Sequence, residues 1–188
     1  KVLDINSEGS DFGAVLTNDN TLYFTSSRNK SKRTDGWNDE PYLDIYKSTM
    51  NGDKTFSKPE EVVELNTRWH DGPVSISSDG NTMYFSRDSH AEKEFEKDKK
   101  LNAKFSQVYL YKATKEGNTW GNIQALPFNS KEYSSSSPSI SKDGKTLYFS
   151  SNMPGSVGET DIWRVAVNAD GTYGKPENMG AKINTEGK

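Results

Sequence analysis

The chain has 188 residues, close to the size of one domain, and its 27 acidic and 24 basic residues give a net charge of −3. This balance gives no reason to expect a nucleic-acid partner, and the lack of cysteine excludes disulfides and thiolate metal sites. No apolar run approaches the roughly 20 residues that span a bilayer. We therefore expect no direct membrane span and place any signal peptide or lipid anchor outside this sequence.

Four Asn-Ser or Asn-Thr pairs mark equivalent points along the chain, with spacings of 60, 63 and 55 residues: Asn6-Ser7, Asn66-Thr67, Asn129-Ser130 and Asn184-Thr185. Repeats of roughly this length are typical of propellers and solenoids. We therefore predict a single region of three repeats, in which residues 1–5 end a previous repeat and residues 184–188 open the next. The boundaries are residues 6–65, 66–128 and 129–183.

Each repeat begins with a short strand and a turn, such as residues 138–141 followed by Asp143-Gly144. We expect a tight hairpin turn of the primed type there and at Asp79-Gly80, because these residue types tolerate positive φ. In the first repeat Asn18-Asp19 takes that place. Each repeat is therefore expected to contain an antiparallel hairpin.

The second strand of each repeat lacks polar alternation, at residues 22–24, 83–85 and 147–149. A strand that is apolar on both faces has to be covered on both faces. Third strands are expected at residues 44–47, 109–112 and 161–164, and fourth strands open with Phe56, Trp120 and Tyr173. Each repeat is thus a four-stranded antiparallel unit of the size of a propeller blade.

The repeats differ most between the second and third strands. These strands are 21 positions apart from Phe24 to Ile45 and 25 positions apart from Phe85 to Leu110. In the second repeat the extra residues are strongly charged, and residues 91–100 are expected to form a short helix with charged i,i+4 partners. A solvated arm and a partner-binding arm are the two interpretations of this charge.

The sequence of residues 138–152 (Pro-x-Ile-Ser-x-Asp-Gly-Lys-Thr-Leu-Tyr-Phe-Ser-Ser-Asn) and the later Asp161-Ile162-Trp163-Arg164 resemble the TolB-type, WD-like β-propeller repeat. The continuation Met153-Pro154-Gly155 and the Asn-Thr junctions resemble copies in OmpA-family envelope lipoproteins of Bacteroidota. This resemblance implies an all-β propeller in the periplasm or at the outer membrane. It also implies envelope proteins as partners, in some cases within type IX secretion.

Propellers close with about four to eight blades, because each blade buries its faces only against its neighbours. Three blades would leave two apolar faces bare. We therefore expect a β-propeller fragment of three four-stranded antiparallel blades, completed by further blades of a larger propeller. Peptidoglycan association would require an OmpA-like domain that these residues do not contain.

Catalytic motifs are missing from the sequence. The Ser run at residues 134–137 lacks the Gly-x-Ser-x-Gly elbow of hydrolases, and His70 and His90 each stand alone on a predicted loop. A carboxylate pair of the glycosidase type is left open. We predict no enzymatic activity and no cofactor. The oxygen-rich loop with Asp35, Asp39 and Glu40 is a candidate calcium site, with a solvated loop as the alternative.

Partner-binding candidates are aromatic and polar residues on the predicted loops: Arg28, Trp37, Trp69, Arg87, His90, Phe95 and Asn152. Packing over their own blade is the alternative for the two tryptophans, and inter-blade hydrogen bonding is the alternative for the two arginines. We predict a non-catalytic scaffold for protein–protein interaction in an envelope assembly, with its partner surface on residues 28–44 and 87–108. The alternative is an accessory propeller of a peptidase or glycan-processing enzyme.

Overall fold

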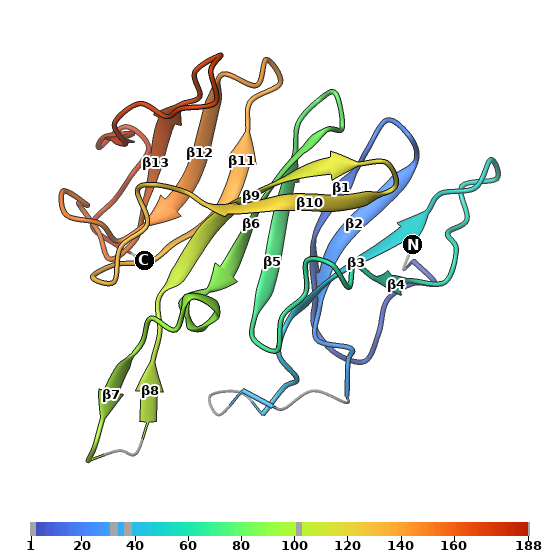
Figure 1. The fold of residues 1–188 in the computed structure, drawn as a ribbon, viewed down its shortest axis with the longest axis horizontal. Helices are drawn as coiled ribbons and strands as arrows, with labels where there is room; N and C mark the ends of the chain where they lie inside the picture. Colours follow the sequence, from blue (N-terminus) through green and yellow to red (C-terminus); the bar gives the residue numbers. More distant parts are fainter. Residues whose placement is uncertain (1–2, 31–33, 36–38, 101–102, 188) are drawn as a thin grey trace.

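The computed structural model describes residues 3–30, 34–35, 39–100 and 103–187, and within them it contains three four-stranded antiparallel sheets and no α-helix (Figure 1). The first sheet contains β1 (Asp11–Leu16), β2 (Thr21–Ser26), β3 (Asp44–Thr49) and β4 (Glu60–Glu61). The second contains β5 (Asp71–Ile76), β6 (Thr82–Asp88), β9 (Val108–Glu116) and β10 (Thr119–Ala125). The third contains β11 (Ser135–Ile140), β12 (Thr146–Ser151), β13 (Asp161–Ala166) and β14 (Glu177–Asn178). The expected all-β class and the four-stranded units are confirmed.

Within each sheet the strands follow chain order. The first strands lie next to one another, since β5 contacts both β1 and β11, and the three sheets stand side by side in Figure 1. Aromatic and aliphatic side chains fill the two spaces between the sheets, with Phe85 and Tyr111 in one and Phe149 and Trp163 in the other. The core is therefore built between the sheets, as in stacked propeller blades.

The second strands are apolar because both of their faces are covered. In β2 and β6 all of residues 22–24 and 83–85 are buried. In β12, by contrast, Leu147 and Phe149 are buried whereas Tyr148 is only half-buried. Alternate residues of a strand point to opposite faces, so Tyr148 lies on the face of the third sheet that no other described sheet covers.

The expected turns of primed type are wrong. Gly80 and Gly144 have φ of 74° and 70°, but the aspartates before them do not have positive φ. A primed type I turn requires positive φ at both central residues. Here Asp79 instead accepts hydrogen bonds from the Ser77 hydroxyl at 2.5 Å and from the Asn81 N–H at 3.0 Å, which closes a longer loop. In the first sheet Asn20, not the expected Asn18-Asp19 pair, has the positive φ, 62°.

The fourth strands are confirmed in outline and shifted in detail. Trp120 lies near the start of β10. In the other two sheets the aromatic residues Phe56 and Tyr173 form only isolated bridges, and β4 and β14 begin after Pro59 and Pro176. Proline has no N–H to donate, so it interrupts the strand at this edge.

The expected helix over residues 91–100 is wrong. A 3₁₀ helix, η1 (Ser89–Glu92), ends at Lys93, which has a φ of 61°. The chain then forms β7 (Glu96–Asp98), which pairs with β8 (Ala103–Phe105). This hairpin projects from the second sheet at the lower left of Figure 1, and we call it the arm. The insertion is therefore an arm, as expected, but its structure is a β-hairpin.

Candidate functional site

The two long insertions and the connection into β5 meet at one end of the first two sheets. The insertions join β2 to β3 and β6 to β9, and the segment before β5 carries Trp69 and His70. The short turns at residues 17–20 and 77–81 lie at the other ends of the same strands. We call the end with the insertions the loop end and the opposite one the turn end.

Five aromatic residues form a continuous row at the loop end. The His90 ring is stacked between Trp69, with ring centroids 4.2 Å apart, and Phe95, at 5.1 Å. Tyr42 meets Trp69 edge-on at 5.6 Å and His70 edge-on at 4.6 Å. We call these residues the aromatic row. It brings together both insertions and the connection before β5.

Hydrogen bonds fix the orientation of both histidines in the row. Nδ1 of His70 accepts a hydrogen bond from the Leu43 N–H at 3.1 Å, so the Nε2 hydrogen faces Asp35 Oδ2, 3.1 Å away. Nδ1 of His90 lies 2.8 Å from Asp88 Oδ1, and this oxygen also accepts from the His90 backbone N–H. His70 thus fastens the first insertion to the segment before β5.

Cations lie over the outer rings of the stack. The Arg68 guanidinium carbon is 4.7 Å from the centroid of the Trp69 ring. At the other end, the Lys104 and Lys97 ammonium nitrogens are 4.6 Å and 5.8 Å from the centroid of Phe95. These distances are those of cation–π contacts. A cationic group therefore covers one face of each outer ring, and the positive charge of these groups favours an anionic ligand.

Two tyrosines of β9 hold the root of the arm. The Tyr109 hydroxyl donates to Glu94 at 2.5 Å, and the Tyr111 hydroxyl donates to Glu92 at 2.9 Å. Burial, followed by the hydrogen bond that each hydroxyl donates to its carboxylate, raises the pKa of both phenols, so they remain donors at neutral pH. A cavity of about 170 Å³ lies beside this root, lined in part by Phe95.

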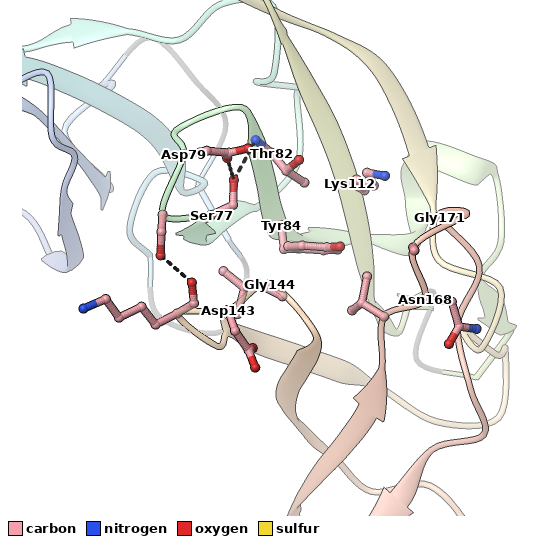
Figure 2. Close-up of a pocket in the computed structure, with 14 residues that line it drawn as sticks. Ser77, Asp79, Thr82, Tyr84, Lys112, Asp143, Gly144, Asn168 and Gly171 are labelled. Atoms are coloured by element: carbon pink, nitrogen blue, oxygen red, sulfur yellow. Dashed lines mark hydrogen bonds between the residues drawn. The ribbon is translucent and has the colours of Figure 1, made fainter.

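A second cavity, of about 380 Å³, lies at the turn end between the second and third sheets (Figure 2). Its carboxylates Asp79 and Asp143 each accept a hydrogen bond from the serine two residues before them. One contact crosses the cavity, from the Ser78 hydroxyl to the Lys142 carbonyl at 2.8 Å. Because both carboxylates are held by their own turns, we assign this cavity to the packing of the two sheets.

Arg87, a candidate partner-binding residue, is buried within the second sheet. Its Nε donates to Asp71 Oδ1 at 2.6 Å, and its Nη2 donates to the Leu65 carbonyl. The guanidinium lies over the rings of Phe85 and Tyr111, 5.0 Å and 4.9 Å from their centroids. These contacts give Arg87 a structural role, because they join the segment before β5 to the first residue of that strand.

Arg28 makes the same contacts in the first sheet. Its Nη2 lies 2.6 Å from Asp11 Oδ1 and donates to the Ile5 carbonyl at 2.9 Å. Burial opposes ionisation of Asp11, but hydrogen bonds from Ser26, Ser7 and Arg28 outweigh it and lower the pKa of Asp11 to about 2. Partner binding by the two arginines stays a prediction, and it is not needed to explain them.

Two partner-binding candidates remain, Asn152 and Trp37. Asn152 directly follows β12, outside the row, and its side-chain oxygen accepts from the Ser134 N–H at 2.8 Å. Trp37 lies outside the described residues. Of the seven candidates, the structure therefore brings together Trp69, His90 and Phe95.

The calcium candidates are partly engaged with other groups. Asp35 pairs with His70, and Glu40 Oε2 accepts from the hydroxyls of Ser10 and Ser27 at 2.9 Å and 3.0 Å. Asp39 has a φ of 57° in the same loop. Across the described ranges, no three His, Cys, Asp or Glu side chains are grouped so that they could hold a metal. Calcium binding stays a prediction.

The sequence did not reveal the roles of Tyr42, Arg68 and the arm lysines Lys97 and Lys104, and it indicated an isolated His70. One signal was available, because Arg68-Trp69-His70 directly follows the Asn66-Thr67 pair and so must lie near the start of β5. No local pattern relates these residues to Phe95, which lies in the other insertion.

Comparison with known proteins supports the fold. No protein-family model and no curated protein matches this sequence. Among solved structures, the chain is similar to a TolB from Agrobacterium tumefaciens, with a TM-score of 0.50 and 18% identity over 88% of this chain and 44% of that one. It is also similar to a puromycin-hydrolysing peptidase of Mycobacterium tuberculosis, with a TM-score of 0.55 and 12% identity over 94% of this chain and 23% of that one.

The chain thus spans less than half the length of either structure. At these identities the likeness shows the fold alone, which is the TolB-like propeller fold expected from the repeat.

Proposed function

We propose that the chain is a non-catalytic propeller scaffold whose loop end binds another protein. The observation that supports this most is that the two insertions, where the repeats differ, fold onto one aromatic row. Residues that repeat, such as Arg28 and Arg87, serve the sheets instead. Protein interfaces are enriched in Trp, Tyr and Arg. Trp69 and Tyr42 belong to this row, and Arg68 lies over the Trp69 ring.

We place this scaffold in the bacterial envelope, in the periplasm or at the outer membrane, with other envelope proteins as its partners. The support is the TolB-like fold together with the resemblance of residues 138–152 to envelope propellers. Within the described part of the chain, no helix is long and apolar enough to cross a membrane. Association with peptidoglycan or with type IX secretion would be a property of a longer parent protein.

We further propose that another blade covers the outer face of the third sheet. Ile162 and Ile183 on that face are 44% and 53% exposed. The residues at the same places in the preceding repeats, Leu110 and Leu65, are fully buried because a neighbouring sheet covers them. A further blade of the same kind would bury both isoleucines by the same packing.

A second function is favoured by one specific observation, the likeness to the peptidase. The chain would then be an accessory propeller that positions substrates for an enzyme whose catalytic residues lie elsewhere. Sequence flanking the propeller would separate the two functions, since a Gly-x-Ser-x-Gly elbow supports the peptidase and an OmpA-like domain supports the scaffold.

Deletion of residues 90–104 tests the scaffold. Proteins that co-purify with the intact chain from envelope extracts are identified by mass spectrometry, and the specific partner should be lost from the deletion variant. Circular dichroism checks that the sheets still fold. Replacement of the turn-end residues 51–54 by a short Gly-Ser linker is the matched control. Unchanged co-purification after the arm deletion would remove the arm from the partner surface.

A further inference from the structure

The arm holds two lysines in an unfavourable arrangement. Lys97 of β7 and Lys104 of β8 are directly opposite each other in the strand register. Both ammonium groups lie over the same ring, that of Phe95. Like charges directly opposite each other destabilise a strand pair, and this hairpin is too short to offer many compensating contacts. The arrangement therefore lowers the stability of the arm when the chain is alone.

The acidic residues of the arm do not neutralise this pair. Glu96 and Asp98 flank Lys97 in β7, so strand alternation places them on the opposite face. At the root, Glu92 and Glu94 accept hydrogen bonds from the two tyrosines of β9. In this part of the described chain, the His90 ring contacts Asp88 and the Lys131 ammonium pairs with Glu94, and neither lysine of the pair takes part in these contacts. The arm thus has one basic face and one acidic face.

The basic face continues into the aromatic row. The stack of Trp69, His90 and Phe95 runs between Arg68 at one end and the lysine pair at the other. A ligand along this row would meet cations at both ends and ring edges between them. Such a pattern suits an extended chain with carboxylates at both ends and an apolar or aromatic side chain between them.

We propose that the basic face of the arm, together with Arg68, binds an extended acidic segment of the partner protein. This inference rests on the proposed scaffold function and names the chemistry of its partner. A carboxylate between Lys97 and Lys104 removes their repulsion, so binding also orders the arm. Since the lysines are exposed, the attraction is screened by salt and binding weakens as ionic strength rises.

This proposal predicts opposite effects of one substitution on stability and on binding. Lys97→Glu places a carboxylate opposite Lys104 and converts a repulsive pair into an attractive one. The arm should become more ordered, while its affinity for an acidic segment should fall. A lysine with a purely structural role would not separate the two effects in this way.

Binding is measured by the fluorescence anisotropy of a fluorescein-labelled peptide, Glu-Glu-Tyr-Glu-Leu-Glu-Glu, with the full chain. We expect Lys97→Glu to weaken binding at least tenfold and to slow amide exchange in β7 and β8. Lys58→Glu, the same charge change at an exposed position before β4, should alter the dissociation constant less than twofold. Raising the salt from 50 to 300 mM should weaken binding of the unmodified chain severalfold.

Equal loss of binding in both variants, or no binding at 1 mM peptide, would overturn the proposal. Binding to phosphatidylglycerol vesicles without binding to the peptide would also overturn it, in favour of a membrane surface. A partner that is lost on deletion of residues 90–104 but retained by Lys97→Glu would refute the acidic segment and leave the scaffold function standing.

Discussion

The contacts between neighbouring sheets predict that Thr25→Val stabilises the protein. Between the second and third sheets, the buried Ser86 hydroxyl accepts a hydrogen bond from the Ser137 N–H at 3.0 Å. Thr25 of β2 occupies the place that Ser86 has in β6. In the second sheet, the position equivalent to Ser137 is Pro73, which has no N–H to donate. Within the described chain, the buried Thr25 hydroxyl oxygen therefore has no hydrogen-bond partner.

The size of the expected gain in the free energy of unfolding follows from this missing hydrogen bond. A buried polar group without a partner costs about 1–3 kcal/mol in lost hydration. Valine keeps the branched shape of Thr25 and removes the polar oxygen, although its methyl group is slightly larger. We expect the free energy of unfolding to rise by about 1 kcal/mol. For a domain of this size, that raises the melting temperature by about 2–4 °C.

The matched control is Ser86→Ala, which should lower the free energy of unfolding by about 1 kcal/mol because it deprives the Ser137 N–H of its acceptor. Urea unfolding followed by tryptophan fluorescence gives both values, provided that the m-value is unchanged. If Thr25→Val lowers the unfolding midpoint as much as Ser86→Ala does, the explanation based on Pro73 is wrong.

Three further changes test other contacts. Asp11→Asn should lower stability at pH 7 and flatten the pH dependence of melting. The lowered pKa of Asp11, about 2, gives a contribution that is complete above about pH 4 and lost as the pH falls towards 2. Asn66→Ala should lower the free energy of unfolding by about 2 kcal/mol, since Asn66 bonds both the N–H and the C=O of Ile45, and denaturant titration measures this. Tyr111→Phe frees Glu92, so trypsin should cut the arm faster, as followed by mass spectrometry.

The repeated strands could be predicted because each of them carries its own signal. Residues 22–24, 83–85 and 147–149 are apolar on both faces, which indicates a strand covered on both faces, as in stacked sheets. The hydrogen bonds made by the repeated asparagines could not be predicted in the same way. Asn66, Asn129 and Asn184 each bond the backbone of a third strand about 20 residues earlier, and the local sequence does not reveal such a contact.

The structure of the arm was mispredicted because tertiary contacts override local helix propensity. Ala, Glu and Lys make up most of residues 91–100, and their intrinsic propensity favours a helix in isolation. In the folded chain Glu92 and Glu94 accept hydrogen bonds from the hydroxyls of Tyr111 and Tyr109, and the short helix η1 ends at Lys93. These hydroxyls come from β9, which follows the insertion.

The candidate site was predicted only as separate residues. Trp69, His90 and Phe95 were selected as exposed loop residues, and the structure places them in one stack. That stack depends on the pairing of the first and second sheets, which brings two insertions of different repeats to one end. The chemistry of the row, with cations over its outer rings, also depends on the register of Lys97 with Lys104.

The proposed function gives the two ends of the sheets separate roles. At the turn end, the Asn18 amide donates to the Ser78 carbonyl at 3.0 Å, and the Ser78 hydroxyl donates to the Lys142 carbonyl. Each contact runs from one sheet to the next. Lys142 stands at the same turn position as Asn18 and Ser78, so a third contact of this kind would run from Lys142 to a further blade. None of these residues belongs to the loop end. Substitution of Phe95 in the aromatic row should thus change binding without separating the sheets, whereas Ser78→Ala should weaken the packing of the sheets without changing binding.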